Sequence, residues 1–371
     1  MRVHIVDPSA YTPPYDHALC SALAAAGADV ELYTSRFAYG AVAPPVGYAR
    51  HELFYRAARF APGSRARRLV KLAEHVPDML SYRRAARAAD VVHFQWLPVP
   101  QLDGRLLPAA RSPGGGRPLV LTAHDILPRE PRPGQREAQR RLYGRFDAVV
   151  VHSERGRERL TRELGVQESC VHVIPHGAFP HLAEGPAAPP PFQTERPVVL
   201  FFGLLRPYKG IDVLLEAWRG IENAELWIAG MPRMDISALP SAPANVRFDA
   251  RFIDGSELRA YFRRADLVVL PYREADQSGV LFTALAFGKP LLVSDVGGLG
   301  EIAATGAART VPAGDVAALH DALKELLGDP AALATMAESA RAAAAGAYAW
   351  EGIAARTLAL YESLLGENRG R

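Results

Sequence analysis

The sequence is poor in cysteine, has no long apolar run and carries little net charge. Its 371 residues include two cysteines, Cys20 and Cys170, which are too few for a disulfide framework and lack metal-site spacing. No apolar stretch reaches the roughly 20 residues that cross a bilayer. The N-terminus enters a short apolar strand directly and lacks the long apolar region of a signal peptide. These features predict a cytoplasmic protein.

The charge balance also disfavours nucleic acid as a partner. The net charge is only +3, and the basic residues are not joined by a nucleic-acid-binding motif or an aromatic platform. Hydrophobic residues make up 49% of the chain and charged residues 22%, as in globular proteins. A chain of this length is too long for one ordinary core, so two domains are expected.

Short apolar, β-branched runs alternate with longer segments of helical period, and this pattern is typical of parallel α/β units. The runs are nearly continuous in apolar residues, as expected of strands buried on both faces. The predicted strands are 2–6, 29–34, 91–96, 119–125, 148–153 and 170–177, then 198–203, 224–230, 246–250, 266–272, 290–298 and 308–314. A helix is predicted from Asp16 to Ala26, closed by Gly27.

A proline-rich stretch, "AEGPAAPPPFQTERP", separates the two series of strands and predicts an extended linker. The prediction is a Rossmann-like domain over 1–183, a linker over 184–197, a second Rossmann-like domain over 198–345 and a final helix over 346–371. Two doubly wound domains would face each other across a cleft. That cleft is the expected ligand site, because open parallel sheets bind ligands beyond the carboxyl ends of their strands.

The loop after the first strand of the second series carries two cations. In "FFGLLRPYKGIDVLLEAW", Gly203 allows a tight turn, and Arg206 and Lys209 follow before a helix. Arginine neutralises a phosphate through its planar fork and lysine acts as a point charge. The alternative interpretation is that both are solvated loop cations.

"READQSGVLFTALAFGKP" places polar residues before an apolar helix that starts near Ser278. The first backbone N–H groups of a helix lack intrahelical partners and can bind an anion. Alternatively, Ser278 is an ordinary helix cap. In "SDVGGLGE", Gly297 and Gly298 indicate either a close approach of backbone to ligand or a plain structural turn.

His124 ends a predicted strand of the first domain, where its side chain would reach the cleft. A histidine there can donate to a sugar hydroxyl or to a developing charge. A purely structural role is the alternative, since His93, His152, His172 and His176 also lie at strand ends.

In combination, these segments resemble the retaining glycosyltransferases of family four, which have the GT-B fold. The resemblance rests on "HDILP", "VVVHSERGRERL", "VIPHGAF", "FFGLLRPYKGIDVLLEAW", "ADLVVLPYREADQSGVLFTALAFGKPLLVSDVGGLGEI", "TVPAGDVAALHDAL" and "AYAWEGIAARTLALYESLL", which occur in the expected order over nearly the whole chain. It implies that the C-terminal helix crosses back to the first domain.

The chain departs from the family pattern at three positions. Leu204 stands where the family usually has an arginine, and Arg206 is the available substitute. Ala275 and Thr283 occupy the positions of two usual glutamates, so ribose contact must weaken or pass to Thr283. Glu274 and Asp276 flank the first gap and could each supply a carboxylate. We interpret the chain as a divergent active enzyme.

Around the first helix, the resemblance places an acceptor-side turn at Tyr15 and Asp16 where relatives have Gly-Gly. Asp16 is equally suited to capping that helix. An acceptor site different from the usual one is implied.

The resemblance implies transfer from a UDP- or GDP-linked sugar to a hydroxyl acceptor, with retention of configuration and no metal or cofactor. The predicted catalytic residues are Arg206, Lys209, His124, Glu274 and Asp276. The predicted donor-binding residues are Gly203, Arg251, Phe252, Ile253, Gln277, Ser278, Gly279, Val280 and Thr283, with the base held by backbone near 251–253. The alternatives are a non-catalytic sugar-nucleotide-binding homologue and a GT-B epimerase or hydrolase.

Two arginine-rich stretches, 56–71 and 129–145, lie in the first domain. They suit an anionic acceptor, or a lipid-linked one held by peripheral contact with the inner face of the membrane, with Phe54, Tyr55 and Phe60 as anchors. The alternative is a solubilising helical surface. Glycan, glycolipid or polysaccharide synthesis would be the setting.

Overall fold

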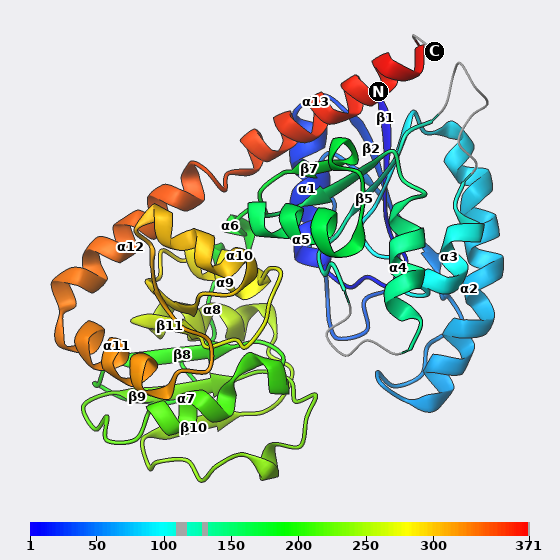
Figure 1. Cartoon of the computed structure of the whole chain (residues 1–371). Coiled ribbons are helices and arrows are strands. Elements are labelled where there is room, and N and C mark those ends of the chain that lie inside the picture. The colour runs from blue at the N-terminus through cyan, green and yellow to red at the C-terminus, as the bar shows by residue number, and fades with distance from the viewer. Residues whose placement is uncertain (109–116, 128–132, 370–371) are drawn as a thin grey trace. The chain divides into compact units, whose positions relative to one another are not determined.

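The computed structural model describes residues 1–108, 117–127 and 133–369 and divides the chain into two units (Figure 1). Unit 1 comprises Met1–Pro175 and Trp350–Arg371, and unit 2 comprises His176–Ala349. Each unit is built on its own parallel sheet. In the part of the chain so described, no helix has both the length and the apolar character of a membrane span.

Unit 1 contains, among its described residues, a seven-stranded parallel sheet in the order β3-β2-β1-β4-β5-β6-β7. The order reverses between β1 and β4, as in a doubly wound sheet. The strands are β1 (Arg2–Asp7), β2 (Asp29–Ser35), β3 (Ala49–Phe54), β4 (Val91–Phe94), β5 (Leu119–Thr122), β6 (Ala148–Val151) and β7 (Val171–Val173).

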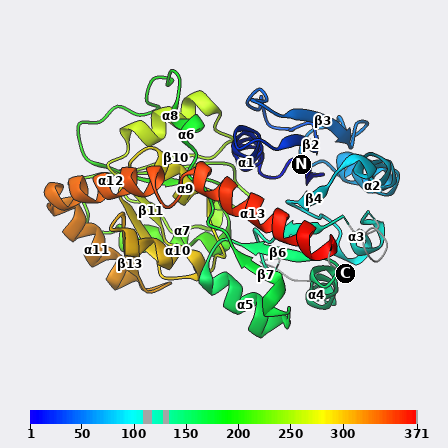
Figure 2. The ribbon, with the colours of Figure 1, turned by 90° about the horizontal axis from the view of Figure 1, so that it is seen from above.

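The helices of unit 1 lie on both sides of this sheet (Figures 1 and 2). They are α1 (Pro13–Ala25), α2 (Arg65–Ala85), α3 (Pro100–Leu106), α4 (Gln135–Tyr143), α5 (Glu154–Leu164) and α13 (Trp350–Arg369), with the 3-10 turns η1 (Ala86–Ala88) and η2 (Glu168–Cys170).

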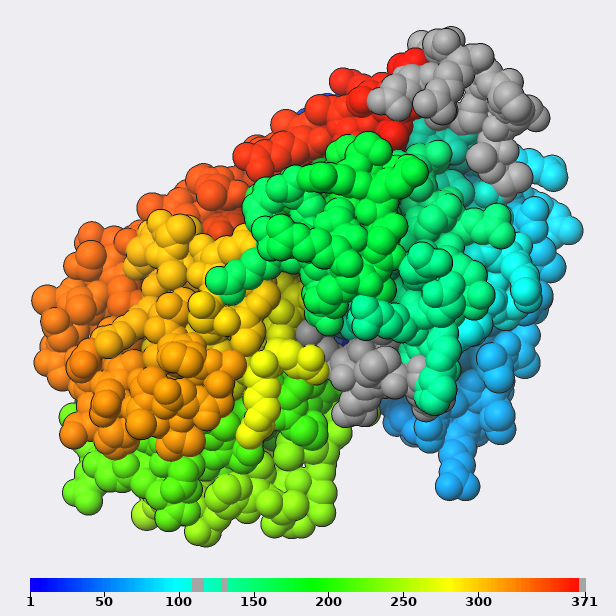
Figure 3. Space-filling model, in the orientation of Figure 1, coloured from blue at the N-terminus to red at the C-terminus, as the bar shows by residue number. Residues whose placement is uncertain are grey.

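The C-terminal helix α13 belongs to unit 1, as predicted, and packs against α1. Its inward face is buried at Ile353, Ala354 and Tyr361, while its outward face is exposed (Figure 3). The Tyr361 hydroxyl lies 2.6 Å from Nδ1 of the buried His93 on β4. Thr122 Oγ1 lies 2.7 Å from the other ring nitrogen of His93. The last helix therefore completes a polar network inside the N-terminal sheet.

Unit 2 has a six-stranded parallel sheet in the order β10-β9-β8-β11-β12-β13. The order reverses between β8 and β11, again as in a doubly wound sheet. The strands are β8 (Val198–Phe202), β9 (Glu225–Ala229), β10 (Val246–Asp249), β11 (Leu267–Leu270), β12 (Leu291–Ser294) and β13 (Ala308–Val311).

Helices also flank the unit 2 sheet (Figure 2). They are α6 (Pro180–Ala183), α7 (Ile211–Ala217), α8 (Gly255–Arg264), α9 (Gly279–Ala286), α10 (Gly297–Glu301), α11 (Val316–Gly328) and α12 (Pro330–Ala345), with η3 (Pro207–Lys209), η4 (Ile236–Ala238) and η5 (Ile302–Thr305). Several of these helices are capped by an aspartate whose side chain accepts a hydrogen bond from a backbone N–H of the first turn. Asp254, Asp315 and Asp329 do so for α8, α11 and α12.

Each predicted strand overlaps an observed one, and the doubly wound architecture is confirmed. The strand that the sequence did not predict is β3. It is an edge strand whose pairing partner, among the described residues, is β2, and most of its residues are exposed or half-buried. Because it lacks the continuous apolar run of a central strand, its pattern resembles a loop.

The division of the chain differs from the predicted boundaries at 183 and 345. The observed breaks follow Pro175 and Ala349. Residues 176–183 belong to unit 2, because His176 stacks on Phe282 with ring centroids 4.1 Å apart and Ala178 N–H donates to the Tyr348 carbonyl.

The predicted linker over 184–197 is also part of unit 2. Arginines of α8 bind its backbone: Arg259 Nε donates to the Pro186 carbonyl at 2.7 Å, and Arg263 donates to the Gly185 carbonyl at 2.9 Å. Arg264 holds the Thr194 carbonyl in the same way. The proline-rich segment forms neither a helix nor a strand, but its backbone carbonyls accept hydrogen bonds that attach it to α8.

Candidate functional site

The candidate site of unit 2 is formed by the loops that follow β8 and β11. These strands are neighbours at the point where the strand order reverses. At such a point adjacent loops diverge beyond the carboxyl ends of the strands and leave room for a ligand. The site is built by residues from these two loops and from the loops after β9 and β12.

Gly203 begins the loop after β8, where a side chain would not fit. Its φ is 112°, and an added Cβ would lie 3.1 Å from Val280 Cγ2 and 3.2 Å from Lys209 Nζ. The backbone of Gly230, after β9, packs directly on it, since a Cβ at Gly230 would lie 1.8 Å from the Gly203 carbonyl oxygen. The Leu205 N–H donates to the Met231 carbonyl at 3.0 Å, which fixes the loop further. The glycine predicted for a tight turn therefore permits close packing of three loops.

Lys209 lies at the end of η3 and is only 7% exposed. Its Nζ donates to Tyr272 Oη at 2.9 Å and lies 4.7 Å from the centre of that ring. Tyr272 Oη lies 3.3 Å from Ser278 Oγ at the start of α9. The alternative of a solvated loop cation is therefore wrong for Lys209. The ammonium group is held against the loop after β11 and next to the N-terminus of α9.

Arg206 precedes η3 and is half-buried. Its Nε is buried and has no hydrogen-bond partner among the described residues. A buried N–H that lacks a partner costs free energy comparable to a lost hydrogen bond. An anion bound beside Arg206 would satisfy this donor.

Helix α9 begins at Gly279, and Ser278 occupies its N-cap position. The Ser278 side chain makes no capping hydrogen bond, because its hydroxyl faces Tyr272. The alternative interpretation of Ser278 as an ordinary cap is therefore wrong. The first amides of an α-helix have no intrahelical acceptor, so those of Gly279 and Val280 remain as donors at the end of the helix.

The loop that leads to α9 is packed against the paired glycines after β12. A Cβ on Gly297, whose φ is 46°, would lie 1.8 Å from the Ala275 carbonyl oxygen. A Cβ on Gly298 would lie 2.3 Å from Gln277 Nε2, and the Gly298 N–H donates to the Asp276 carbonyl at 3.0 Å. The glycine pair thus allows close backbone contact with residues 275–277.

The three polar residues of that loop have different environments. Glu274 is exposed, whereas Asp276 is 6% exposed. Gln277 is half-buried, and its Oε1 has no hydrogen-bond partner within the described ranges. Of the two predicted carboxylate residues, Asp276 is therefore the buried one.

The loops after β8 and β11 are also joined at their outer ends. The Arg273 guanidinium holds both carboxylate oxygens of Asp212 at 2.8 and 2.6 Å, and the Arg273 N–H donates to the Tyr208 carbonyl. The hydrogen bond from Arg273 lowers the pKa of Asp212. This ion pair fixes Lys209, which lies between Tyr208 and the start of α7.

Thr283 lies one turn inside α9 and is buried. Its hydroxyl donates to the Gly279 carbonyl at 2.9 Å. The hydroxyl proton is therefore used within the helix, and only the oxygen lone pairs remain for a ribose.

Residues 251–253 follow β10, the edge strand of the unit 2 sheet, which β9 separates from β8. Arg251 is paired with Glu257 through two bonds of 2.9 and 2.5 Å and with Asp249 at 2.9 Å. Phe252 is 37% exposed and Ile253 is buried. The Arg251 side chain is thus part of an ion-pair network, and base contact by the backbone here stays a prediction.

In unit 1, His124 follows β5 and has a protein group beside each ring nitrogen. Its Nε2 lies 3.0 Å from Gln95 Oε1, and its Nδ1 lies 3.3 Å from His152 Nε2. His152 Nδ1 lies 3.0 Å from the Ile174 carbonyl oxygen. Trp96 stacks on the His124 ring with centroids 5.0 Å apart.

The carbonyl at one end of this chain of contacts sets the direction of its hydrogen bonds. Ile174 can only accept, so His152 Nδ1 carries a hydrogen. Burial lowers the pKa of His152 to about 4, so its Nε2 is an acceptor and His124 Nδ1 donates to it. The other ring nitrogen, Nε2, faces the side-chain amide of Gln95, whose NH₂ group is buried and has no hydrogen-bond partner among the described residues. His124 therefore has no N–H directed at a ligand in this arrangement.

The predicted acceptor-side turn at Tyr15 and Asp16 is wrong. Both residues lie within α1 and are 3% and 1% exposed, so neither can touch an acceptor directly. The helix begins at Pro13, because Thr12 takes the N-cap position. The turn after β1 is instead Pro8–Thr12, and the carboxylate of Asp7 holds it by accepting from the N–H groups of Ser9, Tyr11 and Thr12.

Asp16 shares a hydrogen bond with Asp7 inside unit 1. Burial, and then the neighbouring charge of Asp7, raises the pKa of Asp16 well above its ordinary value. Burial also raises the pKa of Asp7. The folded protein thus holds a proton between these two carboxyl groups to a higher pH than the unfolded chain does, which releases it above about pH 4.

This shared proton makes stability depend on pH. Because the folded pKa of Asp16 exceeds its unfolded value, its contribution is complete below about pH 4 and is lost as pH rises towards the folded pKa. We expect Asp16→Asn to unfold at a higher temperature than wild type at pH 8 and the difference to shrink towards pH 4. Asp321→Asn, an exposed aspartate of α11, is the control. If the difference in unfolding midpoint between wild type and Asp16→Asn is the same from pH 4 to pH 8, the shared proton is refuted.

Sequence reasoning missed two contributors to the unit 2 site. Tyr272 ends the run "DLVVLPY" and connects Lys209 to Ser278, and Gly230 permits the approach of the β9 loop to Gly203. A tyrosine directly after a buried strand was a usable signal for the first. Among the described residues, no group of three or more His, Cys, Asp or Glu side chains is placed to hold a metal ion.

Two family models match the chain, one for each half. The model "Glycosyltransferase Family 4" matches residues 15–180, and the model "Glycosyl transferases group 1" matches residues 196–329. A GDP-mannose:glycolipid 4-beta-D-mannosyltransferase of Xanthomonas campestris pv. campestris is 29% identical over 248 residues, which cover 60% of this chain and 68% of that protein. A D-inositol 3-phosphate glycosyltransferase of Catenulispora acidiphila is 28% identical over 335 residues, with coverages of 81% and 78%.

Solved structures share the fold over almost the full length. Sucrose-phosphate synthase from Thermosynechococcus elongatus superposes with a TM-score of 0.75 at 20% identity and covers 99% of this chain and 100% of its own. HepE from Anabaena, in complex with UDP and glucose, gives 0.71 at 18% identity, with coverages of 98% and 100%. With both halves matched by family models and both sheets present, the chain belongs to the family-four glycosyltransferases of the GT-B fold.

Proposed function

We propose that this glycosyltransferase transfers a sugar from a UDP- or GDP-linked donor to a hydroxyl acceptor, and that the diphosphate binds between Lys209 and the N-terminus of α9. The observation that carries the proposal is the position of Lys209 Nζ, bound to Tyr272 beside Ser278 and Val280. A cation and the free amides of a helix end that converge from two loops form a site suited to an anion.

The donor groups of this site differ in how they would act. Lys209 is held in place by Tyr272, so it supplies a positioned charge with little loss of side-chain freedom. Arg206 contributes an unsatisfied Nε, which a phosphate oxygen would complete. Negative charge grows on the diphosphate as the glycosidic bond breaks, and preorganised donors aimed at that charge lower the barrier.

We propose that the reaction needs no divalent metal, because two cations and a helix end are available to balance the leaving diphosphate. Retention would follow from attack of the acceptor on the same face as the departing phosphate, which takes the acceptor proton. Among the predicted carboxylates, Asp276 is better placed than the exposed Glu274 to hold a sugar hydroxyl. His124 would take part only if Gln95 or His152 released one of its ring nitrogens.

Inversion of configuration is the alternative stereochemical course, and two observations support it. One relative is named as a 4-beta-D-mannosyltransferase, and a β product from an α-linked donor requires inversion. The chain also has Ala275 and Thr283 where the retaining family has glutamates. An inverting reaction needs a protein base, and Asp276 is the buried carboxylate of the loop. Proton NMR of the anomeric centre in the product distinguishes the two courses.

Two relatives are named for a glycolipid and for an inositol phosphate. We propose an acceptor of this kind, made of a polyol or glycan and either soluble or lipid-linked. The reaction would then belong to glycolipid or glycan synthesis, and the protein would act in the cytoplasm or at a membrane surface.

Thermal unfolding in the presence of nucleoside diphosphates tests the donor site. We expect UDP or GDP to raise the unfolding midpoint of the wild type, with the same rise in the presence of a chelator. Arg206→Lys should reduce the rise, because an ammonium group cannot replace the buried Nε and the planar fork. No rise with any nucleoside diphosphate would refute the proposed donor site, and a chelator-sensitive rise would refute metal independence.

A further inference from the structure

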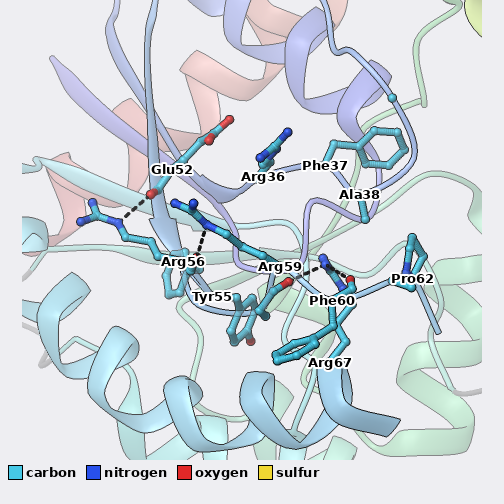
Figure 4. Close-up of a pocket in the computed structure, with 14 residues that line it drawn as sticks. Arg36, Phe37, Ala38, Glu52, Tyr55, Arg56, Arg59, Phe60, Pro62 and Arg67 are labelled. Atoms are coloured by element: carbon cyan, nitrogen blue, oxygen red, sulfur yellow. Dashed lines mark hydrogen bonds between the residues drawn. The ribbon is translucent and has the colours of Figure 1, made fainter. Parts of the chain in front are cut away.

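Unit 1 contains an arginine pocket beyond the ends of β2 and β3. The cavity has a volume of about 690 Å³ and is lined by Arg36, Glu52, Arg56, Arg59, Phe60 and Arg67, among others (Figure 4). Its volume is within the range of roughly 300–1,000 Å³ that is usual for small-molecule sites. Arg36 comes from the segment after β2, Arg56 and Arg59 from the loop after β3, and Arg67 from the first turn of α2 (Figure 4). Three separate segments thus direct cations to one cavity.

Three of the four arginines of this pocket donate to backbone carbonyls rather than to acidic groups. Arg56 Nε donates to the Glu52 carbonyl, Arg59 Nε to the Arg56 carbonyl, and Arg67 to the Ala58 and Phe60 carbonyls. Within the described part of the chain, none of the four guanidinium groups forms an ion pair with a carboxylate, although this protein pairs many of its other arginines in that way.

The charge of the pocket is therefore unbalanced. Four arginines face a single acidic side chain, Glu52, so the lining carries a net charge of +3. Like charges gathered in a cavity repel one another and attract an anion. Arginine presents a planar fork that matches the oxygens of phosphate and carboxylate groups, and it keeps its charge at any physiological pH.

The wall of the pocket is held rigidly by α2. Tyr55 has a φ of 55°, a left-handed conformation that residues other than glycine rarely adopt. Its N–H donates to Asp78 at 2.7 Å, and its hydroxyl lies 2.8 Å from His75 Nδ1. The Ala57 N–H donates to Glu74 at 2.8 Å. Acidic groups of α2 thus bind the backbone of the loop and leave its arginines directed at the cavity, which reduces the entropy cost of binding a ligand.

The pocket lies beside the turn that follows β1. The Tyr55 side chain is close enough to Ser9 for Ser9 to influence its pKa, and the Tyr55 hydroxyl lies 2.8 Å from His75 Nδ1. Ser9 belongs to the Pro8–Thr12 turn that Asp7 holds at the carboxyl end of β1. Ligands of open parallel sheets bind at this edge, so the pocket is adjacent to the expected ligand side of unit 1.

We propose that the arginine pocket binds the phosphate of a phosphorylated acceptor, either a soluble sugar phosphate or the phosphate headgroup of a lipid. This inference rests on the proposed function, because it assigns the pocket to the acceptor of the transfer. The arginines bind the phosphate, and Phe60, which is 49% exposed, lines the entrance beside them. The acceptor is thereby selected by its charge before it reaches the donor.

The test uses the full chain with two pocket variants and one matched control. Arg36→Gln and Arg59→Gln remove a charge without releasing Arg67, which ties the loop together. Arg68→Gln removes the same charge from an exposed position of α2 that does not line the pocket. Calorimetry measures binding of glucose 6-phosphate, with glucose as the neutral probe, and sedimentation measures binding to phosphatidylglycerol vesicles against phosphatidylcholine vesicles.

We expect each pocket variant to weaken binding of the anionic probe by about tenfold, and Arg68→Gln to change it by less than about twofold, because a charged hydrogen bond is lost only in the pocket. If the pocket variants bind glucose 6-phosphate more weakly than wild type, the acceptor is soluble. If they lose only binding to phosphatidylglycerol vesicles, the acceptor is a lipid. If wild type binds neither anionic probe, or if Arg68→Gln weakens binding as much as the pocket variants do, the proposal is overturned.

The same proteins separate this inference from the proposed donor site. We expect nucleoside diphosphates to raise the unfolding midpoint of Arg36→Gln and Arg59→Gln as much as that of wild type. A wild type that binds glucose 6-phosphate through the pocket arginines but gives no rise with any nucleoside diphosphate would contradict the donor site alone.

Discussion

Lys209→Met should reduce the rate of sugar transfer by about 10²–10³-fold, the usual effect of removing one preorganised donor to a developing charge. The methionine keeps the length of the buried stem, so the packing against Tyr272 is preserved while the charge is lost. We expect the unfolding midpoint to change by less than about 4 °C, because Tyr272 keeps its contact with Ser278. The measurement is the release of nucleoside diphosphate from the nucleotide sugar.

Lys324→Met is the matched control for this prediction. Lys324 is an exposed lysine of α11, so the same substitution there removes a charge from unit 2 without touching the loops after β8 and β11. We expect its transfer rate to equal that of wild type. Wild-type turnover in Lys209→Met would show that the buried ammonium group has a structural role, and the phosphate site would then have to be placed elsewhere.

Gly297→Ala should impair both folding and transfer. The added Cβ would lie 1.8 Å from the Ala275 carbonyl oxygen, far inside contact distance, and the residue already has a φ of 46°. The loop of residues 275–278 must shift to make room, which moves Ser278 and the start of α9. We expect a loss of about 2–4 kcal/mol in the free energy of unfolding, from the strained backbone and the displaced loop together, and transfer reduced by about 10²-fold.

Gly314→Ala isolates the backbone component of that effect. Gly314 also has a positive φ, of 77°, but a Cβ there would meet nothing within 4 Å. We expect it to lose stability by about 1 kcal/mol through strain alone and to keep its transfer rate. Equal effects of the two substitutions, measured by denaturant unfolding and donor turnover, would mean that the contact between Gly297 and Ala275 is unimportant for the site.

The architecture was readable from the sequence because parallel strands that are buried on both faces are nearly continuous in apolar residues. The strand β11, "LVVL", is an example, since all four of its residues are buried. The edge strand β3 was missed because its one fully buried residue, Phe54, leaves no such run. Domain boundaries were displaced because a proline-rich segment looks like a free linker whether or not arginines such as Arg259 bind its carbonyls.

The unit 2 site could be located but not described from the sequence. Glycines and cations directly after strands marked the loops correctly, as Gly203 and Lys209 illustrate. What the pattern could not supply was the set of partners at a distance: Tyr272 is 63 residues from Lys209, and it converts an exposed cation into a buried, positioned one. Sequence spacing carries no information on such pairs.

The unit 1 predictions were weaker for the same reason. His124 was chosen for its place at a strand end, yet its ring nitrogens face Gln95 and His152, which are 29 and 28 residues away. Tyr15 and Asp16 were chosen by counting from a family turn, and the helix start at Pro13 moved both into the interior. Polar residues near strand ends can serve the core or a ligand, and only their hydrogen-bond partners distinguish the two.

The return of α13 to unit 1 has a consequence for biosynthesis. Unit 1 is assembled from the first 175 residues and from the last helix, so its packing cannot be completed on the ribosome until Tyr361 has emerged and reached the buried ring of His93. Unit 2 is continuous in sequence and is translated in between. We therefore expect the nascent chain to finish its second unit first and to hold the first one open until synthesis ends.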